Sequence, residues 1–356
     1  MNRIRDIKAA LPRHQIDGLL LTDPVSRRFA AGFSSSAGIL LLSSDAARFI
    51  TDSRYIEAAK AKVQQAEVMA LKKGETYHTH ILSFAKKHGI HTLGFEAERT
   101  TQASFSALSE KLKQDGITLS PADALVASLR QVKSTAELQK IKQAQNITDA
   151  VFADLLGIIR PKLTEKELEC ELIYRVLKQG GEALSFPPIV VSGVRSSLPH
   201  GKAGDFPLSG FLTIDFGAVV DGYCSDMTRT VAVGTPTDEM REIYDTVLRA
   251  QLTGISAAKA GTIGKHIDKA ARDVIDKAGF SAFFGHGFGH GIGLEVHEGL
   301  GPNPREENPL PAGSVLSAEP GIYLPGKFGV RMEDMLYLGE DGTENLTKSP
   351  KELIVL

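Results

Sequence analysis

The sequence predicts two domains, an α/β domain followed by an α+β domain. The chain has 356 residues, which is more than a single hydrophobic core usually serves. Its first third alternates strand-like and helix-like segments, whereas the rest opens with long helices that start at capping boxes. Apolar strands that contain acidic residues follow those helices. We therefore expect an N-terminal domain at residues 1–130 and a C-terminal domain at residues 134–356.

The N-terminal domain is expected to place helices over a mixed sheet. Apolar runs bounded by turn residues indicate strands, and segments with a helical spacing of apolar residues lie between them. The predicted strands are residues 17–23, 38–44, 47–52, 66–71 and 91–98, and the predicted helices are residues 53–65, 79–89 and 103–116.

The C-terminal domain begins with two helices whose starts are marked by capping boxes, in which a hydroxyl and a carboxylate satisfy free backbone amides. The boxes are Ser134 with Glu137 and Thr164 with Glu167. The first helix should end before Pro161 and the second at Gly180, because both residues stop helices. Two further helices are expected at residues 237–260 and 264–279.

Composition argues against several classes of protein. A net charge of −2 provides no basic surface for nucleic acid or an anionic membrane. No segment reaches the roughly 18 consecutive apolar residues that a membrane-spanning helix needs, and residues 1–15 lack the apolar core of a secretory signal. Two cysteines cannot form a disulfide framework. We expect a cytoplasmic protein with neither nucleic-acid nor membrane partners.

A β-hairpin that carries two aspartates is expected in the middle of the C-terminal domain. The dipeptide Asp221-Gly222 supplies the turn signal. A turn centred on it places Asp215 opposite Thr228, with Asp226 as a diagonal neighbour, and a turn one residue earlier places Asp215 opposite Asp226. Both registers put the two carboxylates on one face, because side chains alternate along a strand. Their Cβ atoms would be roughly 5 to 8 Å apart.

Two ionised carboxylates this close inside a sheet repel each other. Either a shared proton or a cation must compensate. The structural alternative is that Asp215 lies on an edge strand and faces solvent. Its apolar neighbours Ile214 and Phe216 favour the buried position.

A second acidic pair follows near the C-terminus. Glu319 ends an apolar strand just before Pro320, and Glu333 lies within a second expected strand at residues 329–338. Arg331 is two residues before Glu333 and would share its face. A local ion pair between Arg331 and Glu333 is therefore the structural alternative to a metal site.

Residues 284–301 contain three histidines among glycines at every second position. The glycines do not follow the Gly-x-Gly-x-x-Gly pattern of dinucleotide binding, and no Glu follows His286 as a zinc-binding helix would require. So many glycines disfavour a helix. We expect an extended or tightly turned backbone, with His286 and His290 on one side and room for a bulky group beside them.

Four carboxylates and an imidazole form a hard, oxygen-rich ligand set. Such a set favours Mn²⁺, Mg²⁺ or Fe²⁺ over an ion that prefers thiolates, and its charge suits two divalent ions about 3.5–4 Å apart. A dinuclear phosphoesterase would use similar ligands. The sequence near these residues contains no cluster of Lys and Arg that would hold phosphoryl oxygens.

These residues resemble a known family. The segments TIDFGAVVDGYCSDMTRT, GHGFGHGIGLEVHE, SAEPGIY and VRMEDM stand in the order found in metallopeptidases of the pita-bread fold, among them methionine aminopeptidase, aminopeptidase P and prolidase. The resemblance covers residues 134–356, and ITDSRYIEAA in the N-terminal domain is similar to the creatinase-type module of the proline-specific members. It implies an α+β pita-bread catalytic domain preceded by an α/β creatinase-type domain.

The resemblance also implies five ligands for two divalent metal ions. Asp215 would bind one ion, His290 and Glu319 would bind the other, and Asp226 and Glu333 would bridge both. A hydroxide between the ions would attack the scissile carbonyl, and Glu319 would accept the proton of the attacking water. Mn²⁺ is the expected metal, with Co²⁺, Zn²⁺ and Fe²⁺ as alternatives.

Four more residues receive roles from the same resemblance. His200 and His297 would act in catalysis and substrate binding, by hydrogen bonds to the substrate carbonyl and the tetrahedral oxyanion. His286 would belong to a proline pocket or support the ligands. Arg331 would orient Glu333 or hold polar groups of the substrate.

The implied activity is hydrolysis of the bond between an N-terminal residue and proline. The enzyme would be an Xaa-Pro dipeptidase or an Xaa-Pro aminopeptidase, acting on Xaa-Pro dipeptides or on peptides with proline at position two. A dipeptidase must exclude longer chains, often by a cap or by a basic residue that reads the carboxylate of the substrate. Arg195 and Lys202 are candidates for that residue, and a solvated surface position is the alternative for each. The family also implies a homodimer. The alternatives are a catalytically silent binding protein on the same fold, or another aminopeptidase specificity.

Overall fold

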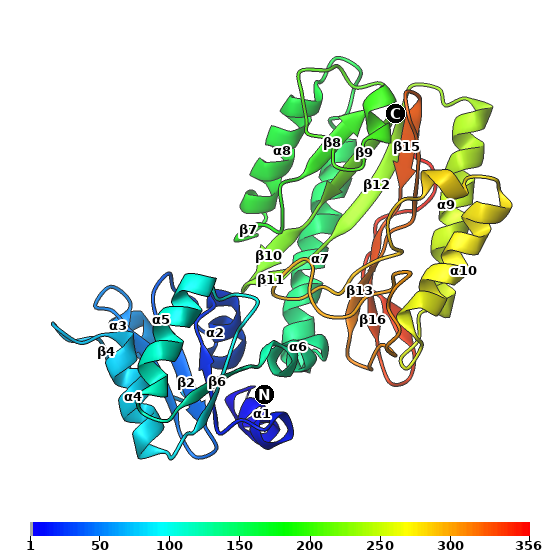
Figure 1. The fold of residues 1–356 in the computed structure, drawn as a ribbon. Coiled ribbons are helices and arrows are strands. Elements are labelled where there is room, and N and C mark those ends of the chain that lie inside the picture. The colour runs from blue at the N-terminus through cyan, green and yellow to red at the C-terminus, as the bar shows by residue number, and fades with distance from the viewer. Residues whose placement is uncertain (1–2) are drawn as a thin grey trace. The chain divides into compact units, whose positions relative to one another are not determined.

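The computed structural model describes residues 3–356 and divides into two compact units, Met1–Arg130 and Gln131–Leu356 (Figure 1). The second unit begins three residues before the start expected from the capping box at Ser134. The α/β and α+β classes predicted for the two parts are both confirmed.

The N-terminal unit is a six-stranded mixed sheet with the strand order β4-β3-β2-β1-β5-β6. Strands β1, β2 and β3 pair antiparallel, and the other neighbours pair parallel. The strands are β1 (Gly18–Leu21), β2 (Ile39–Ser43), β3 (Ala47–Thr51), β4 (Glu67–Ala70), β5 (Thr92–Phe95) and β6 (Thr118–Pro121). The helices are α1 (Arg3–Ala10), α2 (Pro24–Ala31), α3 (Ile56–Lys62), α4 (Tyr77–Lys87), α5 (Gln102–Lys113) and α6 (Asp123–Gln131).

Four of these elements were absent from the prediction: α1, α2, β6 and α6. A start signal for α2 does exist in the sequence, because Asp23 accepts hydrogen bonds from the amides of Val25 and Ser26, and Pro24 occupies the first helical position. Strand β6 is only four residues long and ends in Pro121, so it lacks the apolar run of a typical strand.

The C-terminal unit contains four long helices that cover its strands from two sides (Figure 1). They are α7 (Thr135–Leu156), α8 (Glu165–Lys178), α9 (Asp238–Ala257) and α10 (Gly264–Lys277). Both expected capping boxes are present, at the starts of α7 and α8. Each satisfies amides that would otherwise lack a partner in the first turn of its helix.

The strands of this unit form small antiparallel sheets. The first group is β7 (Ala183–Leu184), β8 (Ile189–Ser192), β9 (Gly210–Phe216), β10 (Ala218–Val220), β11 (Tyr223–Cys224) and β12 (Met227–Val233). The second is β13 (Val315–Ala318), β14 (Gly321–Leu324), β15 (Phe328–Arg331), β16 (Asp334–Leu338) and β17 (Thr343–Asn345). Strand β9 lies between β8 and β12.

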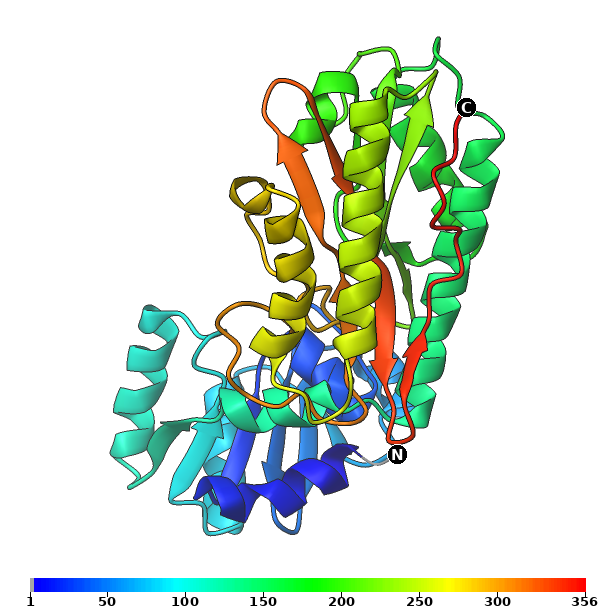
Figure 2. The same cartoon turned by 90° about the vertical axis from the view of Figure 1, so that its right-hand side faces the viewer.

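Two hydrophobic cores lie on opposite sides of these strands, and Figure 2 shows α9 and α10 on the side of the strands that faces the viewer. One packs α7 and α8 on β8, β9 and β12, and the other packs α9 and α10 on β13, β15 and β16. On β9, Leu212, Ile214 and Phe216 point into the first core. Asp215 must face the other side, because successive side chains alternate. The functional residues of β9 are thus directed between the two helix-covered halves.

The hairpin formed by β9–β12 has the register that a turn at Asp221-Gly222 predicts. Asp215 pairs with Thr228, and the same register continues through β10 and β11. Both turn residues have positive φ angles, 46° for Asp221 and 76° for Gly222, which the tight hairpin turn requires. Asp226 is therefore the diagonal neighbour of Asp215, and the alternative register is wrong.

The expected strand at residues 329–338 is interrupted at Met332-Glu333. Before the break β15 pairs with β14, and after it β16 pairs with β13. The amide of Glu333 does not bond within its own hairpin. It donates to Thr228 O of the first hairpin at 3.0 Å. The prediction that Glu333 lies within a continuous strand was therefore wrong. At this break the second hairpin contacts the first, close to Asp215 and Asp226.

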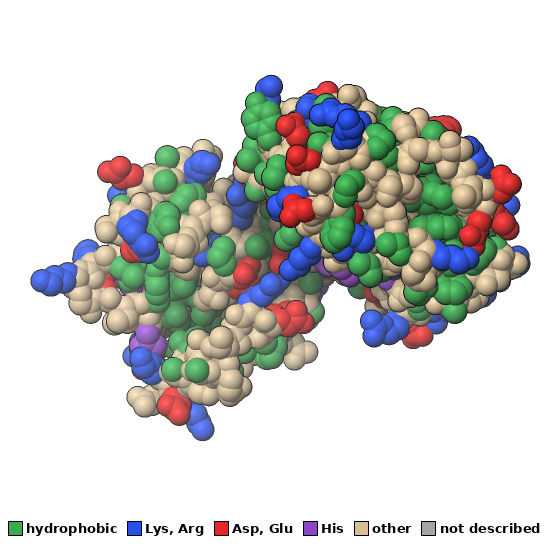
Figure 3. Space-filling view, turned by 90° about the horizontal axis from the view of Figure 1, so that it is seen from above, with side chains coloured by type: hydrophobic (Ala, Val, Ile, Leu, Met, Phe, Trp, Pro, Cys, Tyr) green, Lys and Arg blue, Asp and Glu red, His purple; other side chains and the backbone are tan. Residues whose placement is uncertain are grey.

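The described residues, 3–356, contain no helix that is both long and apolar enough to cross a membrane. Figure 3 shows Lys and Arg side chains interspersed with Asp and Glu over the visible face. This mixing agrees with the small net charge of −2.

Candidate metal centre

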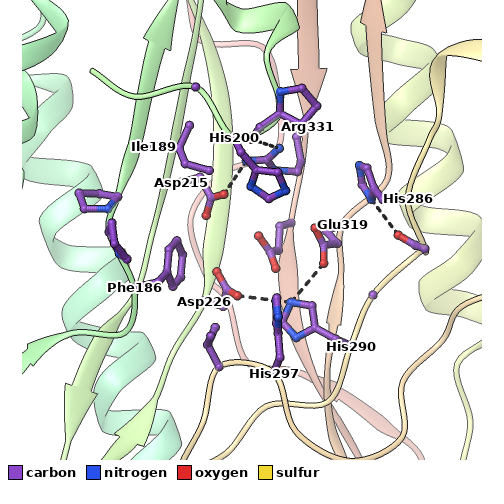
Figure 4. Close-up of a pocket in the computed structure, with 18 of the residues that line it drawn as sticks. Phe186, Ile189, His200, Asp215, Asp226, His286, His290, His297, Glu319 and Arg331 are labelled. Atoms are coloured by element: carbon purple, nitrogen blue, oxygen red, sulfur yellow. Dashed lines mark hydrogen bonds and ion pairs between the residues drawn. The ribbon is translucent and has the colours of Figure 1, made fainter. Parts of the chain in front are cut away.

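The nine residues to which the resemblance gives metal, catalytic or substrate roles line one cavity of about 630 Å³ in the C-terminal unit (Figure 4). They are His200, Asp215, Asp226, His286, His290, His297, Glu319, Arg331 and Glu333. They come from the two hairpins, from the loop that contains Phe284–Gly301 and from the loop after the short helix η2 (Gly193–Ser197).

The acidic side chains converge on His290. Ligand atoms of Asp226, His290 and Glu333 all lie within 4.8 Å of one another. His290 Nε2 is 3.2 Å from Glu319 Oε1 and 3.6 Å from Asp226 Oδ2. Asp215, Asp226 and Glu333 are buried, whereas Glu319 and His290 are half-buried at the cavity. One imidazole and several carboxylates thus surround a small common volume.

The buried carboxylates lack partners for some of their oxygens. Within residues 3–356, Asp215 Oδ1, Asp226 Oδ1 and Glu333 Oε1 have no hydrogen-bond partner. Burial raises the pKa of Asp226 and Glu333 well above the usual range, and neighbouring carboxylates raise it further. Oxygens of this kind suit a hard divalent cation, which would supply the missing partner and neutralise the repulsion. The donor set therefore fits the expected metal.

Glu319 differs from the other carboxylates. Burial alone would raise its pKa, but the hydrogen bond and positive charge of His290 outweigh burial and lower the pKa to about 2. The amide of Glu319 donates to Phe288 O at 2.7 Å. Ser317 Oγ donates to Glu319 Oε1 and accepts from the amide of His290. Strand β13 thereby links the two residues.

Arg331 pairs with Asp215 instead of Glu333. Its Nη2 lies 2.5 Å from Asp215 Oδ2, and both side chains are buried. The predicted local pair with Glu333 is therefore wrong. The break after β15 separates the two side chains. Arg331 also donates to the hydroxyl of Tyr323 at 2.9 Å and to Thr228 Oγ1 at 3.1 Å.

Thr228 connects the two acidic pairs. It lies opposite Asp215 in the hairpin register, and its hydroxyl donates to Glu333 Oε2 at 2.8 Å. The same hydroxyl accepts from Arg331 Nε. One buried threonine thus fixes a ligand candidate of the second hairpin and the arginine that holds Asp215.

The glycine–histidine loop approaches other backbone closely. A Cβ on Gly289 would lie 2.1 Å from Ser317 O, and one on Gly291 would lie 2.0 Å from Glu298 O. The space beside the glycines is therefore filled by the chain itself, and the expectation of room there for a bulky group was wrong. Only glycine allows the loop to lie against β13 closely enough to bring His290 to Glu319.

The remaining histidines have distinct surroundings. His286 Nε2 is 2.9 Å from the Tyr323 hydroxyl, and burial lowers the pKa of His286. The His297 ring lies 4.0 Å from the His290 ring, centre to centre. Burial and the nearby His290 lower the pKa of His297. His200 and His297 are exposed to the cavity, so both can reach a bound molecule.

The cavity also has an apolar wall and a basic edge. Phe186-Pro-Pro-Ile189 and Val296 form the apolar part, and Ile189 pairs directly with Asp215. The exposed side chains of Lys202 and Arg305 line the cavity, and neither forms an ion pair within residues 3–356.

The comparison with family models identifies both units. Residues 139–340 match metallopeptidase family M24, and residues 3–132 match the creatinase/prolidase N-terminal domain. The chain belongs to metallopeptidase family M24. The M24 domain carries the convergent carboxylates, so the resemblance to pita-bread metallopeptidases is confirmed. The chain is a metallopeptidase of a family that depends on divalent metal ions.

Similar M24 proteins match nearly the whole chain. A solved Xaa-Pro dipeptidase from Bacillus anthracis is 43% identical, with a TM-score of 0.95 and 99% of each chain covered. An X-Pro aminopeptidase from Thermotoga maritima is 40% identical, with a TM-score of 0.90, and 96% of this chain and 98% of that chain are covered. An uncharacterised peptidase of Bacillus subtilis is 41% identical over 96% of each chain.

Several residues of the M24 site were missed in the sequence. Tyr323 was not predicted as a site residue, because an aromatic residue in an apolar strand is usually part of a hydrophobic core. Thr228 did have a signal, since one of the two hairpin registers places it opposite Asp215. Arg195, a candidate for reading a carboxylate, is instead bound to the fully buried Glu165 at 3.1 Å. Lys202 remains a candidate for binding a substrate carboxylate, because it lines the cavity.

Proposed function

We propose that the enzyme hydrolyses the bond between an N-terminal residue and proline, with two divalent metal ions. One observation carries the proposal. Around His290, buried carboxylate oxygens have no hydrogen-bond partner among residues 3–356, and they line a cavity large enough for a short peptide. Similar proteins described as Xaa-Pro dipeptidase and X-Pro aminopeptidase support the choice of substrate.

Five side chains would hold the metal ions: Asp215, Asp226, His290, Glu319 and Glu333. When bound, two such ions would supply Lewis-acid charge for the scissile carbonyl and lower the pKa of the attacking water. Arg331 keeps one oxygen of Asp215 in place and leaves Oδ1 free. Thr228 does the same for Glu333, where Oε1 remains free.

The chain's own groups would move protons and hold the substrate. Glu319 lines the cavity beside His290 and would accept a proton from the attacking water on a carboxylate oxygen. His297 has a lowered pKa and is therefore neutral, so one ring nitrogen can donate to the substrate carbonyl oxygen. His200 faces the same cavity and would support the same oxygen. His286, held by Tyr323, would shape the site beside them.

The basic edge of the cavity favours a substrate with a free carboxylate. Lys202 and Arg305 are exposed cations without acidic partners among residues 3–356, and a carboxylate within a few ångströms would satisfy either one. The carboxylate of a dipeptide lies on its proline, next to the scissile bond. We therefore favour Xaa-Pro dipeptides over longer peptides with proline at position two.

The test compares Ala-Pro with Ala-Pro-Ala, using metal-stripped protein with and without Mn²⁺. We expect Mn²⁺-dependent cleavage of Ala-Pro, and a raised KM with little change in kcat for the double variant Lys202→Ala, Arg305→Ala. Lys327→Ala is the control, because Lys327 pairs with Glu239 outside the cavity. Equal cleavage of Ala-Pro-Ala would instead indicate an aminopeptidase. Cleavage of neither peptide would leave the silent-binding alternative.

The identity of the metal and the oligomeric state are further parts of this proposal. Mn²⁺ suits the oxygen-rich ligands, and reactivation of stripped protein by Mn²⁺, Co²⁺, Zn²⁺ or Fe²⁺ in parallel would rank them. A homodimer is supported by the exposed apolar side chains of Val194, Leu198 and Phe206. Light scattering at several protein concentrations measures the mass directly.

A further inference from the structure

The loop at residues 284–290, which contains His286 and His290, has no regular secondary structure that would set its backbone conformation. Gly285, Gly287 and Gly289 occupy every second position. Glycine has the largest backbone freedom of any residue, so such a segment has no conformation of its own. The place of the two histidines must therefore come from groups outside the loop.

Helix α10 supplies these groups through Asp268 and Arg272, which lie one turn apart. Arg272 Nε and Nη2 donate to the two carboxylate oxygens of Asp268 at 2.9 and 3.0 Å. Asp268 Oδ1 accepts from the amide of Phe288 at 2.8 Å. Arg272 donates to Phe284 O at 3.0 Å and to His286 O at 2.7 Å. The pair thus holds three alternate residues of the loop.

The loop residues that the pair holds are themselves hydrogen-bonded to residues of the acidic site. Phe288, whose amide is held by Asp268, accepts from the amide of Glu319 through its carbonyl. His286, whose carbonyl is held by Arg272, reaches the Tyr323 hydroxyl through its ring. Asp268 is only 2% exposed. The Arg272 side chain is half-buried, and a bidentate pair with a buried carboxylate has far less freedom than a surface pair.

We propose that Asp268 and Arg272 are positioning residues that set the affinity of the metal centre through the backbone of residues 284–288. The inference rests on the proposed dinuclear function and adds a second layer of residues to it. Groups that orient metal ligands typically change metal affinity by about 10- to 100-fold when they are lost. We expect the loss here to fall on the ion that His290 and Glu319 would bind.

Helix α10 contains a matched control one residue further along. Lys269 and Asp273 form an ion pair with the same four-residue spacing, 2.6 Å long, but both side chains are exposed and neither holds the loop. Lys269→Gln and Asp273→Asn therefore remove the same kind of helix pair as Arg272→Gln and Asp268→Asn. Any difference between the two sets reports on the loop and not on the helix.

The experiment titrates metal-stripped full-length protein with Co²⁺ and follows the visible absorption of the bound ion, together with the melting temperature of each variant without metal. We expect Arg272→Gln and Asp268→Asn to weaken the second equivalent of Co²⁺ by about 10-fold or more. The two controls should stay within about twofold. Arg272→Lys should recover part of the affinity, because an ammonium group can still donate to one loop carbonyl.

The outcomes separate this inference from the proposed function. If the variants melt at lower temperature but bind Co²⁺ as tightly as wild type, the pair only stabilises the fold and the inference is wrong. If wild type binds no Co²⁺, the metal centre itself is refuted and the inference falls with it. If Asp268→Asn does not fold, Arg272→Gln and Arg272→Lys still decide the outcome, because Asp268 keeps its bond to Phe288.

Discussion

Arg331 Nη2 lies 2.5 Å from Asp215 Oδ2, although the two residues are 116 positions apart in the chain. The pair joins the second hairpin to the first inside a buried site. It occupies one oxygen of Asp215, and the other has no partner in the described part of the chain, residues 3–356. A residue expected to neutralise Glu333 therefore orients the carboxylate of a different metal-ligand candidate.

The first prediction concerns this pair. Arg331→Lys keeps the positive charge but loses the fork that reaches Asp215, Tyr323 and Thr228 together. We expect kcat/KM for Ala-Pro to fall by about 10- to 100-fold. Tyr323→Phe removes only one of these contacts and should cost less. Steady-state kinetics at saturating Mn²⁺ measure both, and equal activity of wild type and Arg331→Lys would contradict the orienting role.

The second prediction concerns a buried ion pair beside the site. Arg229 is 2% exposed, and its Nη2 donates to Asp334 Oδ1 at 2.8 Å. It also donates to the carbonyls of Glu333 and Ser349. Arg229→Met leaves the Asp334 carboxylate with Lys351 and Asn345 as its remaining partners, so unfolding should become easier by at most about 3–5 kcal/mol.

Urea denaturation of the metal-free protein measures this change. Lys327→Met is the control, because the Lys327–Glu239 pair is exposed and should contribute about 0–1 kcal/mol. A similar small loss for Arg229→Met would mean that the buried pair is replaceable by apolar contacts.

The third prediction concerns Gly254 on α9. A Cβ at this position would lie 2.2 Å from the ring of Phe288. Alanine normally stabilises a helix relative to glycine, but here Phe288 must move, and overpacking costs about 1–3 kcal/mol. Since Phe288 leads into His290, we expect Gly254→Ala to lower both stability and Mn²⁺ affinity.

Gly157 provides the comparison. Its Cβ would have only an ordinary contact of 3.6 Å, and its φ angle of −71° suits alanine. Gly157→Ala should be neutral or stabilise by up to about 1 kcal/mol. Thermal melts with and without Mn²⁺ separate the two effects, and a Gly254→Ala protein that melts above wild type would refute the packing argument.

The fourth prediction concerns metal removal. The metal-free protein contains buried carboxylates whose oxygens lack partners, so bound ions should stabilise the folded state only. At a free Mn²⁺ concentration 100 times the dissociation constant, the gain is about 2.7 kcal/mol per site. Burial and neighbouring carboxylates raise the pKa of Glu333 and so oppose its ionisation in the folded protein. Glu333→Gln removes this cost and should raise the melting temperature without metal while reducing the Mn²⁺-induced increase. An unchanged increase would show that Glu333 does not bind the ion.

Much of the architecture follows from local signals. The capping boxes at Ser134 and Thr164 start α7 and α8, because the same residues satisfy the helix amides in any context. The turn at Asp221-Gly222 fixes the hairpin register, and alternation then places Asp215 and Asp226 on one face. Short elements such as β6 were missed because tertiary pairing, and not propensity, makes them strands.

The sequence by itself therefore determined the starts of α7 and α8, the hairpin with its two possible registers, and the residue types of the candidate metal centre, since each depends on neighbours in the chain. The tertiary structure alone decided which partners those residues have. Asp268–Arg272 and Lys269–Asp273 are similar as sequence, because each places two opposite charges four residues apart, although in opposite order. The packing of α10 against the loop buries Asp268 and half-buries Arg272, and it leaves Lys269 and Asp273 exposed. Partners that are far apart in the chain meet only when separate elements pack together, and no local pattern encodes that choice.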